Sequence, residues 1–238
     1  MKYPFKHFND LTKADICCDW HTHTTQTDGH ATPEEMMARA AALKLSSLAF
    51  TEHVTRSSSW FAGFKEALVG MKKPARLKVL VGIEAKAVDF HGAIDATPAV
   101  IESAELVLGV VHRYPDGNGG LLSLEEMHHL PAEKARDIEF RLALGMLEHN
   151  RQIDVLAHPM GVYQKFFHDF PHDELRRLMQ KSLEKRIAFE INTKYLTDTD
   201  QLFALLRSVN PFVSLGSDAH STEEIARDFA RIIHEVES

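Results

Sequence analysis

Residues 19–30, DWHTHTTQTDGH, contain three histidines and two aspartates. Side chains at positions i and i+2 of a strand face the same side, so His21 and His23 can reach one ion where a strand ends in a loop. The chain then turns at Asp28 and Gly29 and presents His30. An HxH pair alone is a weak signal, because histidine is also an ordinary polar loop residue. The stretch as a whole predicts one corner of a metal site.

Short apolar runs of strand length recur along the chain, and nearly all end in a residue type that binds metals. The runs cover 47–51, 77–83, 105–111, 153–157, 187–191 and 212–215, and the residues that end them are His53, Glu84, His112, His158, Asn192, Asp218 and His220. Amphipathic helices are expected around these runs, with N-terminal caps at Thr32, Ser59, Ser123 and Ser221. Seven strand–helix units without a linker predict one α/β domain over residues 1–238, built on a parallel sheet.

Closing such a sheet gives a barrel, and the sites of βα barrels lie at the carboxyl ends of the strands. The residues expected there are His21, His23, His53, Glu84, His112, His158, Asp218 and His220. One catalytic zinc ion takes about three protein ligands, so this larger set predicts two or three ions. A carboxylate can bridge two cations and an imidazole cannot, so Glu84 or Asp218 is expected to lie between ions.

Composition restricts the partners. The net charge is −7 and no basic block is present, which argues against polymeric nucleic acid and for a small substrate. Cys17 and Cys18 are adjacent and are predicted to be small core residues, so we expect no disulfide framework and a cytoplasmic location. No stretch has the length of a bilayer span, so no membrane partner is expected. The oligomeric state is left open.

The motifs HTH, DGH, TEH, GIE, VVH, AHP and SDAH, in this order, resemble those of the PHP domain family, the polymerase and histidinol phosphatase superfamily. The spacing is most similar to that of small stand-alone bacterial PHP phosphoesterases. The resemblance implies a distorted (β/α)7 TIM-like barrel and a trinuclear centre of zinc, manganese or iron. It implies three ligand sets, namely His21, His23, Glu84 and Asp218; then Glu84, His112 and His158; then His53 and His220 with one loop ligand.

The opening loop offers two candidates for that last ligand. Asp28 is preferred, because TDG matches the commoner family pattern, and His30 is the alternative. Asp28 can also be read as an ordinary turn aspartate before Gly29. Further along the chain, the aromatic stretch 161–171, GVYQKFFHDFP, is expected to be a loop on the same face. It would either pack against the barrel rim or form a lid or substrate wall.

Clustered divalent ions lower the pKa of bound water and hold phosphate oxygens during in-line displacement. The predicted function is therefore hydrolysis of a phosphomonoester of a small metabolite by metal-bound hydroxide, and the family makes histidinol phosphate one candidate substrate. Glu84, Asp218 and His220 are the predicted catalytic residues, and Arg113 and Lys194 are predicted to bind the substrate phosphate. Two alternatives stay open: a phosphodiesterase or nucleotide hydrolase on the same scaffold, and a metal-binding PHP module without catalysis.

Overall fold

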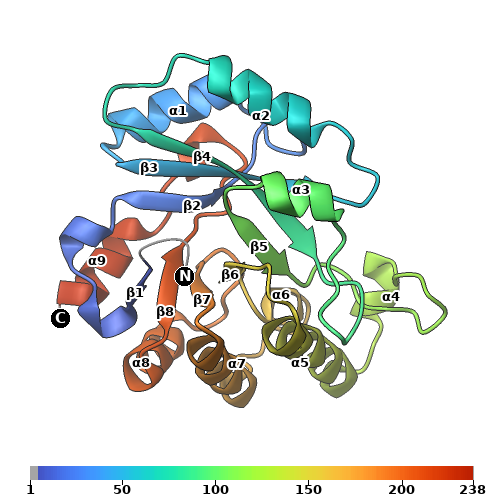
Figure 1. Cartoon of the computed structure of the whole chain (residues 1–238). Helices are drawn as coiled ribbons and strands as arrows, with labels where there is room; N and C mark the ends of the chain where they lie inside the picture. The colour runs from blue at the N-terminus through green and yellow to red at the C-terminus, as the bar shows by residue number, and fades with distance from the viewer. Residues whose placement is uncertain (1–4, 238) are drawn as a thin grey trace.

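The structure is a computed structural model that describes residues 5–237. Its sheet has the strand order β1-β8-β7-β6-β5-β4-β3-β2. Strands β2 to β8 run parallel, as the sequence predicts, and β1 pairs antiparallel with β8 (Figure 1). The strands are β1 Lys6–His7, β2 Cys18–Thr22, β3 Ser47–Val54, β4 Lys78–Lys86, β5 Val107–Val110, β6 Val155–Leu156, β7 Ala188–Ile191 and β8 Phe212–Leu215. The α/β class is confirmed.

The sheet curves like a barrel but does not close through a continuous ladder between β2 and β8. Within residues 5–237, an isolated bridge between Thr22 and Ala219 joins these two edges. Below that bridge, the buried Asp19 carboxylate accepts hydrogen bonds from the Ser217 amide (3.0 Å), the Ser217 hydroxyl (2.6 Å) and the Ala226 amide (2.9 Å). The Asp19 side chain therefore replaces part of the missing backbone pairing between β2 and β8. Strand β1 pairs with the same edge of β8 at Phe212 and Val213.

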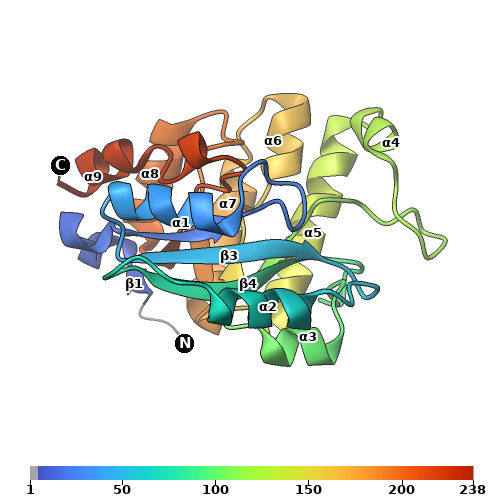
Figure 2. The ribbon, with the colours of Figure 1, turned by 90° about the horizontal axis from the view of Figure 1, so that it is seen from above.

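Helices surround the curved sheet on its outer face. Figure 1 shows α1 and α2 over β3 and β4, and α5, α7 and α8 under β6, β7 and β8. Figure 2 shows the same arrangement from above, with α4 at the edge of the molecule and an extended loop projecting next to it. The helices are α1 Pro33–Ala42, α2 Phe61–Gly70, α3 Pro98–Ser103, α4 Leu124–His128, α5 Ala132–His149, α6 Gly161–Phe167, α7 His172–Lys185, α8 Thr199–Val209 and α9 Phe229–Glu237.

The predicted helix starts agree with the structure where the cap is local. Thr32 and Glu35 form the expected capping box of α1, and Ser123 caps α4 in the same way. Two other starts are wrong. Helix α2 begins after Trp60 without a side-chain cap from Ser59. Ser221 precedes only a short 3-10 turn, and α9 begins at Phe229. The Glu224 carboxylate does not complete a capping box with Ser221, because it accepts the backbone amide of His220 at 2.7 Å.

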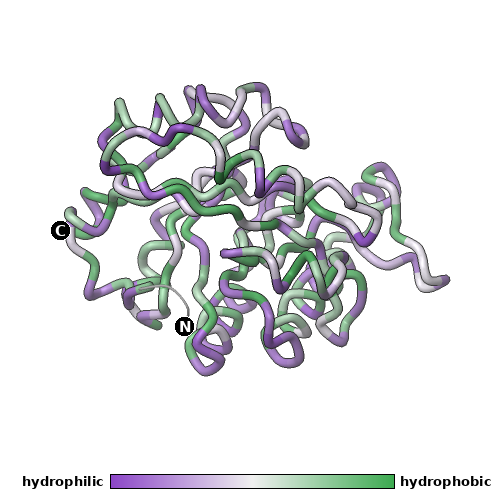
Figure 3. Tube along the Cα trace, turned by 45° about the horizontal axis from the view of Figure 1, so that its top comes forward, coloured by the Kyte–Doolittle hydropathy of each residue, from purple (hydrophilic) through white to green (hydrophobic). Residues whose placement is uncertain are grey.

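Apolar side chains between the sheet and the helices form the core. Figure 3 shows hydrophobic residues along the central strands and hydrophilic ones on the outer turns of the helices. Cys17 and Cys18 are only partly buried, and Cys18 alone packs against the core, so the assignment to the core is wrong for Cys17 and holds in part for Cys18. Both sulfur atoms lie near the hydroxyl of Ser46, just before β3. None of the helices within the described range combines the length and apolar character of a membrane span.

Candidate metal centre

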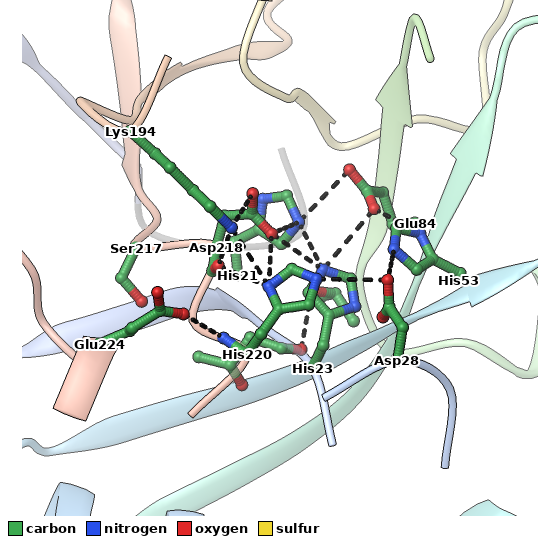
Figure 4. Close-up of polar contacts among 12 residues, drawn as sticks. His21, His23, Asp28, His53, Glu84, Lys194, Ser217, Asp218, His220 and Glu224 are labelled. Carbon is green, nitrogen blue, oxygen red and sulfur yellow. Dashed lines mark hydrogen bonds and ion pairs between the residues drawn. The ribbon is translucent and has the colours of Figure 1, made fainter. Parts of the chain in front are cut away.

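The predicted ligand residues converge at the carboxyl ends of the parallel strands. His21, His53 and Glu84 lie in β2, β3 and β4, and His53 pairs in register with Glu84. The remaining residues follow the strands directly in loops, where the chain is free to turn them toward the barrel axis. Figure 4 shows side chains from both edges of the sheet pointing toward one another. Four overlapping groups have ligand atoms close enough to share an ion: His23, Asp28, His53 and His220; His21, His23 and Asp218; His21, Glu84 and His158; and His53, Glu84 and His112.

Glu84 lies at the centre of this cluster and is 2% exposed. Its Oε1 is 2.9 Å from His158 Nε2, 3.3 Å from His21 Nε2 and 3.4 Å from His112 Nε2, and its Oε2 is 2.8 Å from His53 Nδ1. Burial favours the protonated carboxyl, but the surrounding imidazoles hold the pKa of Glu84 well below its usual range. An ionised carboxylate that faces imidazoles on both oxygens has the position expected of a bridging ligand.

The HxH pair behaves as its strand geometry predicts. His21 Nε2 and His23 Nε2 lie 3.1 Å apart, and Asp218 Oδ1 is 3.2 Å from His23 Nε2 and 3.7 Å from His21 Nε2. Burial lowers the pKa of His23 to about 4, so the ring is uncharged at neutral pH. Two nitrogen atoms and a carboxylate oxygen therefore converge on one point, which is the donor set that a divalent transition-metal ion takes.

Glu190 of β7 supports this arrangement, although it was not among the residues predicted for the site. Its Oε1 lies 2.7 Å from His21 Nδ1 in the interior. A carboxylate on one ring nitrogen leaves the other as the metal donor, and carboxylate–histidine–metal arrays of this kind orient the ligand in metalloenzymes. Gly216 makes room for the pair, because a Cβ there would meet Glu190 Oε1 at 2.0 Å. The residues present fit bound metal.

The opening loop brings Asp28, and not His30, to the cluster. Asp28 Oδ2 is 3.2 Å from His53 Nε2 and 3.4 Å from His220 Nε2. His30 is exposed and its ring lines a separate surface hollow next to Glu35. Of the two candidates left open by the sequence, the geometry supports Asp28.

The model of the PHP domain family matches residues 19–194 of this chain. The chain belongs to the PHP family. A probable phosphatase of Aliivibrio fischeri is 27% identical over 227 residues, which cover 89% of this chain and 81% of the relative. A probable phosphatase of Vibrio parahaemolyticus is 25% identical over 228 residues, which cover 90% of this chain and 82% of the relative.

Solved PHP structures confirm the fold. Histidinol phosphate phosphatase from Lactococcus lactis, in complex with zinc, L-histidinol and phosphate, superposes with a TM-score of 0.69 at 20% identity over 93% of this chain and 94% of that chain. A putative histidinol phosphatase from Listeria monocytogenes superposes with a TM-score of 0.66 at 19% identity over 90% of this chain and 99% of that chain. At this identity the likeness concerns the fold, which is the distorted TIM-like barrel that the motifs implied.

The two predicted phosphate-binding cations take different positions in this PHP chain. The Lys194 ammonium lies 3.0 Å from Asp218 Oδ2 and 2.9 Å from the Asp218 carbonyl, so it is directed into the cluster (Figure 4). Tyr195, which the sequence analysis did not select, donates its hydroxyl to the same Oδ2 at 2.7 Å. Arg113 lines the cavity above the cluster and donates to the Leu122 carbonyl at 3.2 Å.

Two cluster residues have an unusual backbone. His158 and Asp218 adopt the left-handed conformation, with φ of 61° and 51°. Among residues other than glycine, asparagine, aspartate and histidine adopt it most often, so both residue types suit their positions. Tertiary contacts on both side chains hold this conformation, which turns His158 and Asp218 from the strand ends toward the cluster.

A cavity of about 350 Å³ opens directly above the cluster. Its inner end is formed by residues of the cluster, and its outer end by α4 and α6. The stretch 161–171, which we expected to be a loop, contains the helix α6, so that prediction is wrong for residues 161–167. The helix is short and enters from Met160 in the left-handed conformation, which no periodicity in the sequence signals. Helix α6 nevertheless forms a wall of the cavity, one of the two roles considered for this stretch.

Proposed function

We propose that this PHP protein is a metal-dependent phosphomonoesterase acting on a small phosphorylated metabolite. The observation that carries the proposal is the position of Glu84, whose two oxygens face ligand groups on both sides, below a cavity of metabolite size. The names of the two relatives, both probable phosphatases, support hydrolysis of a phosphoric ester. Zinc and phosphate in the Lactococcus lactis structure support the same chemistry.

We propose that two to three divalent ions of zinc, manganese or iron bind in the cluster. His21, His23, Glu84 and Asp218 would hold one ion, and Glu84, His112 and His158 a second. Asp28, His53 and His220 would hold the third, in agreement with the group these residues form with His23. Bound ions of this kind activate water and neutralise the charge of a phosphate. Among the catalytic residues, Glu84 and Asp218 would align the ions, and His220 would face the substrate from the cavity wall.

The cations of the chain have separate tasks in this proposal. Lys194 is held over the cluster by Asp218, so its ammonium is positioned to contact a phosphate oxygen at the inner end of the cavity. Arg113 lines the cavity, and its planar guanidinium would suit a phosphate there. Tyr195 keeps Asp218 oriented, because its hydroxyl occupies the second carboxylate oxygen.

Hydrolysis assays on protein of measured metal content test the proposal. We expect turnover of p-nitrophenyl phosphate that depends on added zinc, manganese or iron, and much slower turnover of bis-p-nitrophenyl phosphate. A faster reaction with the diester would favour the phosphodiesterase alternative. Bound metal without hydrolysis across a panel of phosphoesters would instead show a metal-binding module without catalysis.

A further inference from the structure

The outer end of the cavity differs in chemistry from the inner end. Its wall there comes from α4 and α6 and includes Leu124, Val162, Lys165 and Phe166. Leu124 is 52% exposed although it is a large apolar residue, and it faces this space. Phe166 packs against the ring of His128 of α4, with ring centroids 5.2 Å apart. The two helices therefore offer an apolar slot to whatever lies beyond the phosphate.

The charges along the cavity are distributed unevenly. Among residues 5–237, the carboxylates that line it are Asp28 and Asp218, and both belong to the metal cluster. Outside the metal cluster, the charged side chains of the lining are Arg113 and Lys165. Beyond the cluster, the cavity therefore offers a bound molecule positive charge and no carboxylate.

Lys165 is a free cation at this outer end. Over residues 5–237, its ammonium forms no ion pair with a carboxylate, and it lies 5.8 Å from the centre of the Tyr195 ring. The same Tyr195 donates its hydroxyl to Asp218, so its ring spans the distance from the cluster to Lys165. An anion at Lys165 would thus be one side-chain length from the phosphate site.

The helix that carries Lys165 is fixed by a buried carboxylate. Glu139 of α5 is 1% exposed and accepts the backbone amides of Val162 (3.2 Å) and Tyr163 (2.7 Å) at the start of α6. It also accepts the hydroxyl of Tyr114 at 2.6 Å, and Tyr114 directly follows Arg113. One carboxylate therefore holds in place both segments that carry the cations of the cavity, so the wall is a built feature of the fold.

Building on the phosphomonoesterase function proposed above, we propose that the alcohol part of the substrate carries a second anionic group, which Lys165 binds. Its apolar portion would lie in the slot between Leu124 and Phe166. An amine at this position, such as that of L-histidinol, would meet Lys165 and find no carboxylate to bind it. The chain is thereby assigned a different substrate class from amino alcohol phosphates.

Three aryl phosphates of similar shape test this assignment on the metal-loaded enzyme: phenyl phosphate, 4-carboxyphenyl phosphate and 4-(aminomethyl)phenyl phosphate. Hydrolysis of phenyl phosphate reports the proposed function alone. We expect kcat/KM for the carboxylate probe to exceed that for the amine probe by at least about fivefold, mainly through KM, and the ratio to shrink as salt is added. A ratio of one or below overturns the assignment even if phenyl phosphate is a good substrate.

Variants of Lys165 locate the effect. Lys165→Met keeps the length of the side chain and removes the charge, and it should bring the carboxylate-to-amine ratio close to one. Lys165→Glu should invert the ratio. Lys134→Met, which removes an exposed lysine of α5 outside the cavity lining, should leave the ratio as in the wild type. An unchanged ratio in both Lys165 variants would contradict the proposal.

Discussion

The cluster has two parts that differ in burial. The side chains of His21, His23, Glu84, His158 and Asp218, which we call the floor, are at most 7% exposed. Those of Asp28, His53, His112 and His220, which we call the rim, are 20–54% exposed. Floor residues have partners behind them, among them Glu190, Tyr195 and Lys194, whereas rim residues contact mainly one another and the floor. From this difference we expect metal held by the floor to be bound more tightly than metal held by the rim.

The largest effect is expected at the centre of the floor. Glu84→Ala removes the carboxylate that faces the imidazoles of His21, His53, His112 and His158 and belongs to two of the four possible ligand groups. Bound metal should therefore be lost, and kcat/KM should fall by at least about a thousandfold. Metal analysis and p-nitrophenyl phosphate hydrolysis measure both effects. Glu84→Gln is the matched variant, because it keeps the shape and removes the charge. Full activity and metal content in either variant would contradict the role of Glu84.

The next largest effect is expected from substitution of Glu190, which supports His21 of the floor. Glu190→Gln keeps the packing in β7 but replaces the charged partner of His21 Nδ1, so metal affinity should fall by about 10- to 100-fold. Excess metal should restore much of the activity, since no direct ligand is removed. Titration with a metal indicator measures the affinity. A loss that no metal concentration restores would instead show that Glu190 holds the fold of the site.

The rim should tolerate substitution better than the floor. We expect Asp28→Asn to weaken one ion by about tenfold and to lower activity at limiting metal, because an amide is a poorer ligand than a carboxylate. His30→Ala in the same loop is the control and should change activity less than about twofold. Activity against metal concentration separates the two variants. The reverse ranking would make His30 the loop ligand.

The smallest effect on the cluster is expected from Glu139, which lies outside it. Burial raises the pKa of this carboxyl to about 7, although the hydrogen bonds donated to it act to lower that pKa. The folded state therefore holds a proton that the unfolded state releases near pH 4.5, so the free energy of unfolding should fall by up to about 3 kcal/mol as pH rises from 4.5 to 7.

Glu139→Gln is the control for that pH dependence. Glutamine does not titrate, so the variant lacks this loss of stability. The free energy of unfolding of the wild type minus that of the variant should therefore fall as pH rises over this range. Denaturant unfolding at several pH values measures the difference. A difference that stays constant with pH would show that Glu139 does not cause the pH dependence of stability. Unchanged metal content in Glu139→Gln would show that metal binding by the floor does not depend on Glu139.

Much of the fold follows from local pattern. Strand positions could be read from apolar runs because a parallel strand is buried on both faces, and α1 and α4 from capping boxes because these involve residues three apart. Helix α6 and the start of α9 could not be read from local pattern. Helix α6 is stabilised by Glu139 from a different helix. Glu224, which the sequence pairs with Ser221 as a cap for α9, instead binds the His220 amide.

The residues around the cluster show the same division. His21, Glu84 and Asp218 stand out in the sequence because each ends or nearly ends an apolar strand. Glu190 stands within its strand, and only its charge in the buried run AFEI signals it. Tyr195 carries no such signal, because tyrosine in a loop is ordinary.

By itself, the sequence determined most of the parallel strands, several of the helices, the family and the residues that gather at the strand ends, because strand and helix periodicity are local properties of the chain. Only the tertiary structure brought Asp28, and not His30, to the cluster, placed Glu190 behind His21 and put Lys165 in the cavity lining. Each of these depends on side chains that are far apart in the chain and meet only after the sheet has curved. Such distances are set by the packing of the whole barrel, and no short stretch of sequence contains them.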